Sequence, residues 1–302
     1  MSLPKIYGVY LNNLSWHQIS KLYAECFSGG SAKYKIEKIN EMIERLDRLP
    51  ENDIILQYLF AGRISTNWYK LTEERVNRIS EIKQKLNDIS SDILDQGCYS
   101  QLSDEFDFVH AIEKGNKLFI TLGIGNYRDT ITINDYKLVQ SPSEYFCTII
   151  IREDNNIIEI RANEMLRHKL LNIVIEKLGI KTIPGFGKPL ITEDIFMNFY
   201  NAIPDAEIKK YKGKDLDPQS RTELLELTAK HGVDYAQNPE EFYQMRENYQ
   251  DLSLTFIFNF NGSTFPFRFN LLTGSLYFPS IISEDAIDYI FDIYYQTIME
   301  GI

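Results

Sequence analysis

The stretch Tyr145–Asn163, YFCTIIIREDNNIIEIRAN, holds two apolar strands on either side of the turn at residues 153–156. A second stretch, Leu252–Asn270, reads LSLTFIFNFNGSTFPFRFN and repeats this layout at an offset of 107 residues, so that Arg161 aligns with Arg268. Apolar residues on both sides of a short turn are typical of β-hairpins. We therefore expect two related hairpins, each associated with a helix, to form the framework of the fold.

The rest of the chain predicts an α+β fold around these hairpins. Its 302 residues are 44% hydrophobic and 13% aromatic, which is enough to bury a sizeable core. We expect a helical subdomain over residues 1–98. Two similar antiparallel β-sheet-plus-helix units then follow over residues 99–182 and 190–302, the second with inserted helices. The boundary between them falls at residues 183–189, IPGFGKP, where two prolines and two glycines oppose regular structure.

The N-terminal third is dominated by apolar residues at helical spacing. In the helix expected to begin at Thr72, apolar residues repeat at alternating intervals of three and four. These residues are Ile79, Ile82, Leu86, Ile89 and Ile93. Such a seam either packs within the same chain or joins two copies of it as a coiled coil. We favour packing within the chain, because two heptads are fewer than a sustained coiled coil needs.

Capping residues place the later helices. Asn163 and Gly179 suit the two ends of a helix over residues 164–178. The helices expected in the last third are Glu193–Asn201, Pro218–His231 and Pro239–Tyr249. The lysine-rich segment 204–214 shows no strand pattern, so we expect a solvated loop there.

The charge of the chain limits the partners it can attract. The net charge is −11, but residues 1–90 hold 13 Lys and Arg against 11 Asp and Glu. A negative net charge disfavours non-specific binding of nucleic acid. This argument does not apply to the N-terminal third, whose net charge is slightly positive. No apolar run reaches about 18 residues, so we expect no membrane association through a spanning helix. Three widely separated cysteines, Cys26, Cys98 and Cys147, indicate a reducing compartment, so we expect a cytoplasmic protein.

Asp205, Glu207 and Lys209 resemble the acidic and Glu-x-Lys elements of metal-dependent nucleases. That chemistry needs two carboxylates on one Mg²⁺ and a lysine near the attacked phosphate. Those enzymes normally separate the first Asp from the Glu-x-Lys by the length of a strand, whereas here the two carboxylates are nearly adjacent. We therefore favour a solvated charged loop and keep the catalytic interpretation as the alternative.

Lys38 and Arg45 are the candidate nucleic-acid contacts. They lie seven residues apart in the expected helix over residues 34–46 and so share one of its faces. Glu37, Glu41 and Glu44 interleave with them, and a face of mixed charge is more often ordinary solvated surface.

No pattern of residues predicts a cofactor or a metal site. The four histidines have no metal-ligand spacing among themselves, and the glycine-rich segments are too short for a P-loop or a dinucleotide fingerprint. We therefore expect a non-enzymatic intracellular interaction protein that recognises a protein partner, a second copy of itself or nucleic acid. The alternative is a metal-dependent nuclease or another phosphoester hydrolase.

Overall fold

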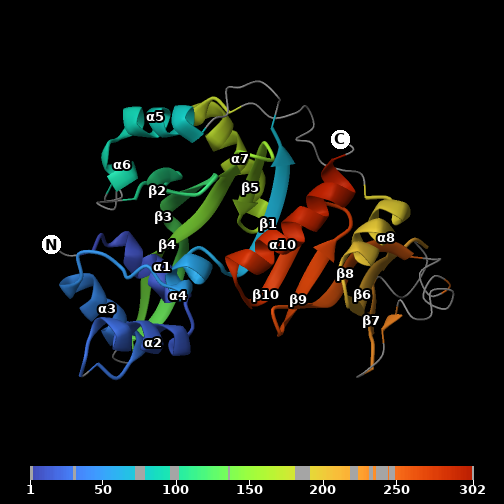
Figure 1. Cartoon of the computed structure of the whole chain (residues 1–302), viewed down its shortest axis with the longest axis horizontal. Helices are drawn as coiled ribbons and strands as arrows, with labels where there is room; N and C mark the ends of the chain where they lie inside the picture. The colour runs from blue at the N-terminus through green and yellow to red at the C-terminus, as the bar shows by residue number, and fades with distance from the viewer. Residues whose placement is uncertain are drawn as a thin grey trace. The chain divides into compact units, whose positions relative to one another are not determined.

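The computed structural model describes residues 3–29, 32–71, 79–95, 102–134, 137–180, 191–217, 224–230, 234–235, 244 and 249–300. The chain forms two compact units. The first comprises Met1–Phe60 and Trp68–Phe186, and the second comprises Ala61–Asn67 and Gly187–Ile302. Helices and antiparallel strands occur in both, which confirms the expected α+β class (Figure 1). Among the described residues, no helix combines the length and apolarity that a membrane span needs.

Within the described part of the chain, the first unit combines four N-terminal helices, a sheet and three later helices. In chain order its elements are α1 (Ile6–Asn13), α2 (Trp16–Cys26), α3 (Lys35–Arg45), α4 (Asp53–Tyr58), the end of β1 (Gly62–Lys70), α5 (Ile79–Ile89), α6 (Asp92–Asp95), β2 (Asp107–Lys114), β3 (Lys117–Asn134), β4 (Lys137–Arg152), β5 (Ile157–Arg161) and α7 (Glu164–Leu178). Its strands lie in the order β2, β3, β4, β5 and the end of β1. The hairpin expected at residues 145–163 is present, since β4 pairs with β5 antiparallel, and β2 and β3 form a further antiparallel pair.

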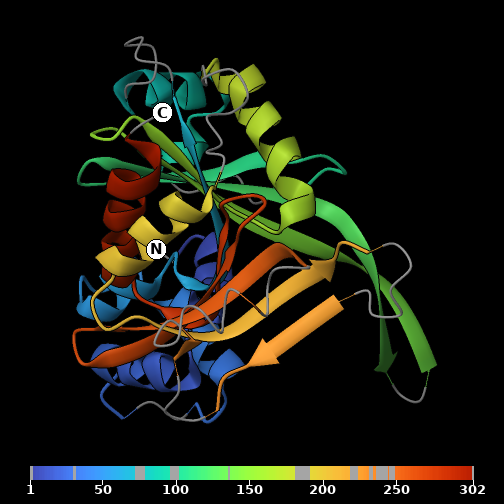
Figure 2. The ribbon, with the colours of Figure 1, turned by 90° about the vertical axis from the view of Figure 1, so that its right-hand side faces the viewer.

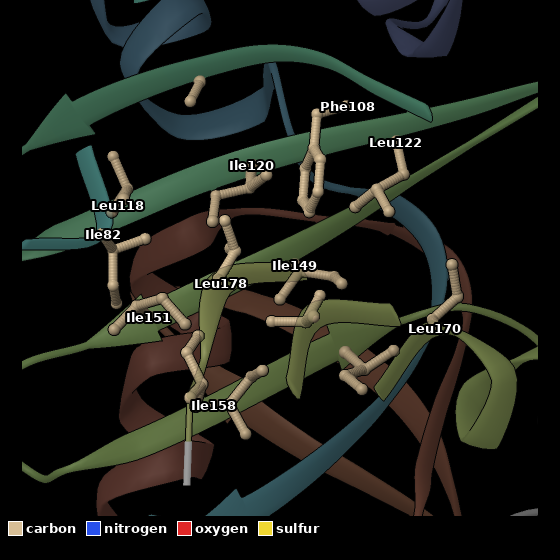
Figure 3. Packing of buried hydrophobic residues seen from close by; sticks show 14 of the residues in the cluster. Ile82, Phe108, Leu118, Ile120, Leu122, Ile149, Ile151, Ile158, Leu170 and Leu178 are labelled. Atoms are coloured by element: carbon tan, nitrogen blue, oxygen red, sulfur yellow. The ribbon is translucent and has the colours of Figure 1, made fainter. Parts of the chain in front are cut away.

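The sheet of the first unit is covered on both faces, which explains its continuous apolar runs. Ile149 and Ile151 of β4 point to one face, where they pack with residues of α5, α6 and α7 (Figure 3). Ile150 points to the other face and packs with residues of helices α1 to α4. A strand that is buried on both faces does not need to alternate polar and apolar residues. Strand β5 is such a strand, since all five of its residues are buried.

A buried group of charges lies within the β4–β5 hairpin. Glu159 is completely buried, and its carboxylate oxygens accept hydrogen bonds from Arg152 Nε at 2.8 Å and Arg161 Nε at 2.6 Å. Arg161 Nη1 also donates to the Phe60 carbonyl at 2.9 Å. Burial by itself would raise the pKa of Glu159, but Arg161 and Arg152 outweigh it and hold the pKa below its usual value. The carboxylate therefore stays ionised and binds both arginines.

The second unit has a sheet with helices packed on one face. Its elements are the start of β1, α8 (Glu193–Ala202), β6 (Glu207–Asp215), β7 (Leu224–Thr228), β8 (Tyr249–Phe260), β9 (Ser263–Asn270), β10 (Leu276–Ile282), α10 (Glu284–Tyr294) and the π-helical turn η4 (Tyr295–Met299). The strand order is β1, β10, β9, β8, β6, β7, and each described pairing is antiparallel.

Phenylalanines build the core of the second unit. Phe256 of β8 stacks on Phe267 of β9 with ring centroids 4.9 Å apart. Phe199 of α8 stacks on Phe269 at 5.3 Å, and Tyr294 of α10 meets Phe269 at 6.3 Å. Helices α8 and α10 therefore cover the same face of these strands (Figure 2). The strict alternation of β8 and β9 follows from this one-sided burial.

Several expected helices are confirmed at their predicted ends. Helix α7 spans Glu164–Leu178, as predicted from its caps. The Asn163 side chain accepts a hydrogen bond from the Leu166 amide at 3.1 Å, and Gly179 has a φ of 61°, which suits glycine. Helix α8 begins after its Thr192 cap. Four residues of the expected seam, Ile79, Ile82, Leu86 and Ile93, pack within the chain and join the sheet core, whereas the fifth, Ile89, is 48% exposed.

The expected loop at residues 204–214 and the expected helix Pro218–His231 are wrong where they can be checked. Residues 207–215 form strand β6, and Leu224–Thr228 forms strand β7 beside it. A β-bulge between Ile208 and Lys210 separates the buried Ile208 and Tyr211 by three residues, which hides the period of two. Residues 224–228 form an edge strand because β6 supplies backbone partners, and tertiary pairing of this kind overrides local helix signals.

The helical interpretation of residues 1–98 also needs correction. Strand β1 lies inside this segment, and the helix expected to run through Ile93 ends at Ile89 before the short helix α6. Other expectations lie outside the described residues: the cap at Thr72, the boundary at 183–189, Cys98, and nearly all of the helix at 239–249. The relation between the two β units stays a prediction.

Replacing Glu159 by Gln should lower the free energy of unfolding of the first unit by about 3–5 kcal/mol, because it removes the carboxylate that pairs with two buried arginines. Urea unfolding can be followed by tryptophan fluorescence, since Trp16 and Trp68 both belong to this unit. The matched control is Glu113→Gln, which removes an exposed ion pair with Lys83 and should cost less than about 1 kcal/mol. Equal losses in the two variants would contradict this role for Glu159.

Candidate functional site

The N-terminus of helix α2 holds its first residues in a defined conformation. The Gln18 amide donates to Ser15 Oγ at 3.2 Å, and Gln18 Oε1 accepts from the Ser15 amide at 2.8 Å. This reciprocal arrangement is a capping box, and it satisfies amides that would otherwise lack partners. Trp16, the first residue of the helix, therefore extends from a well-ordered turn.

Lys38 of α3 lies against the side chains of α2. Its ammonium nitrogen is 5.1 Å from the centroid of the Trp16 ring and 5.5 Å from that of Tyr23. It also donates to Ser20 Oγ at 2.9 Å. The three contacts engage the ammonium group, and one of them places it over the Trp16 ring, where the attraction favours this ring position.

Arg45 makes a similar contact one helical repeat further along α3. Its guanidinium carbon is 4.8 Å from the centroid of the Phe27 ring, and the group is paired with Glu41. Glu41 also accepts a hydrogen bond from the Tyr23 hydroxyl, which raises the pKa of that hydroxyl. The charge of Arg45 is thus already balanced by a carboxylate.

Large exposed aromatic side chains gather at the N-terminal ends of α2 and α3. The Trp16 residue is 57% exposed and Tyr34, which precedes α3, is 68% exposed. Lys35 Nζ donates to the Asn12 carbonyl at 2.7 Å, so the two helix ends lie close together. We call Trp16, Tyr34 and Lys38 the Trp16 surface. Sequence reasoning selected Lys38 and Arg45 but missed Trp16, whose position at the start of an amphipathic helix is the signal that could have found it.

Comparison with known proteins adds no homologue to this geometry. The sequence matches no protein-family model, and no curated protein matches it. The chemistry of the candidate site therefore has to be argued from its own residues.

The structure brings together two of the three residues of the nuclease interpretation. Glu207 and Lys209 lie on β6 and form an ion pair. Asp205 lies on the preceding turn, is exposed, and has a positive φ of 53°. Among the described residues, no group of three or more His, Cys, Asp or Glu side chains is arranged to hold a metal ion. The structure thus adds no further metal ligand to the pair of carboxylates, and the nuclease interpretation stays a prediction.

Asp234 is a buried carboxylate near this segment that sequence reasoning did not select. Its Oδ1 accepts from the Ile208 amide at 2.8 Å, and its Oδ2 accepts from the Tyr200 hydroxyl at 3.0 Å. Burial and the negative charge of Asp234 raise the pKa of Tyr200. Both oxygens are used to attach β6 to helix α8, so Asp234 has a structural role.

The first unit also contains an open depression of about 430 Å³ beside α5 and β2. The only cation among its described lining residues, Lys83, is already paired with Glu113 at 2.7 Å, and the Glu153 carboxylate accepts from the Ile79 amide at 3.3 Å. This described lining thus carries one negative charge in excess, and each of its three charged groups already has a partner. It is a weaker candidate than the Trp16 surface.

His110 is buried in the first unit and bonded to Tyr10. The Tyr10 hydroxyl lies 3.0 Å from His110 Nδ1 and 2.7 Å from Thr121 Oγ1. Burial lowers the pKa of His110 to about 4. The imidazole is therefore neutral at pH 7, and its partners are all within the core.

Acidification should destabilise the first unit through His110. An unfolded histidine has a pKa of about 6.5, so between pH 6.5 and pH 4 the unfolded chain binds a proton that the folded chain does not. Lowering the pH from 7 to 4.5 should therefore cost about 2 kcal/mol, because each pKa unit corresponds to about 1.4 kcal/mol. His110→Gln should lose this part of the pH dependence, as measured by urea unfolding at the two pH values. The control His17→Gln, at an exposed position, should retain it, and an unchanged slope in His110→Gln would contradict the assignment.

Proposed function

We propose that this is a non-enzymatic interaction protein that binds a protein partner through the Trp16 surface. The observation that carries the proposal is the exposed Trp16 ring in contact with the Lys38 ammonium group. Tryptophan and tyrosine are enriched among the residues that dominate protein–protein binding energies, because they bury a large area with few rotatable bonds. A ring that is already oriented loses less conformational entropy on binding.

The charges around this surface favour a protein over nucleic acid. Lys38 is bonded to Ser20, and Arg45 is paired with Glu41, so releasing either group to a phosphate would break existing contacts. Glu37 and Glu41 also lie on α3, where they would repel a phosphate backbone. A protein partner that offers an apolar pocket for Trp16 matches the exposed ring and leaves Lys38 and Arg45 in their present contacts.

Trp16→Ser should weaken partner binding about 30-fold or more, because an interface tryptophan commonly contributes at least about 2 kcal/mol. The folded protein should be unaffected within about 0.5 kcal/mol, since the side chain is largely exposed. Partners would be isolated from cells on immobilised wild-type protein, identified by mass spectrometry and then titrated as purified proteins. Lys38→Gln should weaken the same partner several-fold, because it releases the Trp16 ring.

The matched control is Ile36→Ser. Ile36 is 59% exposed, and helical spacing places it on the opposite side of α3 from Lys38. It should keep full affinity. A partner that binds wild type and Trp16→Ser equally would contradict the proposal. Salt-sensitive binding of a labelled single-stranded oligonucleotide that depends on Trp16 would also contradict the proposal, since it would identify nucleic acid as the ligand of the Trp16 surface. Sedimentation of the purified protein at rising concentration shows whether the chain binds a second copy of itself. A sedimentation coefficient that does not rise with concentration leaves a different protein as the partner.

A further inference from the structure

The second unit has a sheet face that helices α8 and α10 do not cover. On this face the cross-strand register places Lys210 of β6 opposite Thr255 of β8, and Lys212 opposite Ser253. Arg268 of β9 lies opposite Thr255 on its other side. Three cationic side chains and two hydroxyl groups from three neighbouring strands therefore meet on one face, far along the chain from the Trp16 surface.

The strand register places one carboxylate, Glu226 of β7, opposite Lys212, but the three cations are not in ion pairs among the residues that the structure describes. Neither Lys210, Lys212 nor Arg268 forms an ion pair there. The side chains of Ser253 and Thr255 likewise form no hydrogen bond with the described residues. In a chain with a net charge of −11, carboxylates outnumber cations, so unpaired cations that gather on one face are unexpected for ordinary surface.

The five side chains border a small depression of about 50 Å³, and their donors line it. One carboxylate, that of Glu226 on β7, also lines it, which leaves two positive charges in excess. One water molecule needs about 10–15 Å³ of such space, so the depression has room for a group the size of a few waters, such as one phosphoryl group. The Arg268 guanidinium carbon lies 5.8 Å from the centroid of the Tyr277 ring, which orients its N–H groups before any ligand binds.

We propose that this depression binds the phosphoryl group of a small phosphorylated ligand. Lysine, arginine and hydroxyl groups are the donors that proteins use for phosphate, and arginine can bind two of its oxygens at once. The depression accommodates a single phosphoryl group, and the net charge of the chain repels an extended polyanion. We therefore assign the site to a small ligand and not to a nucleic-acid backbone.

The test is isothermal titration of the complete chain with pyrophosphate at low and physiological salt. Wild type should bind with one site per chain. Lys212→Gln and Arg268→Gln should each weaken binding about tenfold or more, because each removes a charged donor to the anion. The matched control is Lys214→Gln, which makes the same change on the same strand at an exposed position that does not line the depression. It should change the affinity less than about twofold, since its charge is largely screened.

Glu226→Gln supplies a test of opposite sign. It removes the negative charge beside the bound anion and should tighten pyrophosphate binding several-fold. A general loss of folding cannot produce a tighter complex. Thermal unfolding of every variant shows whether it is folded, and if Arg268→Gln is not, Lys212→Gln and Glu226→Gln decide the question.

Three results would overturn the proposal. The first is the absence of saturable pyrophosphate binding by wild type. The second is equal weakening by Lys214→Gln and Lys212→Gln, which would indicate only a general charge effect. The third is much tighter binding of a ten-residue oligothymidylate than of pyrophosphate, which would assign the face to a polyanion. Trp16→Ser should leave pyrophosphate binding unchanged, so failure of either proposal can be recognised independently of the other.

Discussion

Glu159, buried between Arg152 and Arg161, sets the register of the β4–β5 hairpin on which the first unit depends. A one-residue slip of either strand would turn a buried charge to the opposite face and leave it without its partner. Apolar residues alone could not exclude such a slip, because Ile149, Ile150 and Ile151 are buried whichever face they occupy. An unpaired charge in a core raises the free energy of the folded state. This is why removal of one of the three charged side chains destabilises the unit, and also why the group specifies the register.

The two units bury their sheets differently, and this decides where surfaces remain for binding. In the first unit helices cover both faces of the sheet, so its exposed aromatic residues lie on the helices, at the ends of α2 and α3. In the second unit α8 and α10 cover the face that carries the phenylalanines. The opposite face carries Lys210, Lys212 and Arg268 in place of apolar side chains. Each candidate surface is thus a consequence of how its own unit is layered.

The cationic side chains of the two surfaces differ in whether they already have partners. On the helices, cations are already engaged: Lys38 with Ser20 and two aromatic rings, and Arg45 with Glu41. Their role there is to fix aromatic side chains, which suits recognition by shape and apolar contact. On the sheet face the cations point at a small depression without ion-pair partners among the described residues, which suits an anion. A net charge of −11 says nothing of either arrangement, because it averages over both.

The sequence by itself determined the α+β class, the β4–β5 hairpin and the ends of helix α7, all of which depend on residues close together in the chain. It also placed Lys38 and Arg45 on one helix face, although not the aromatic rings of α2 that they contact. Only the tertiary structure decided that residues 207–215 and 224–228 are strands. Their backbone partners come from other strands, and the bulge after Ile208 hides the alternation that would have revealed the first of them. The cluster of Lys210, Lys212 and Arg268 was unpredictable for the same reason, since it exists only once β6, β8 and β9 pair across nearly sixty residues of chain.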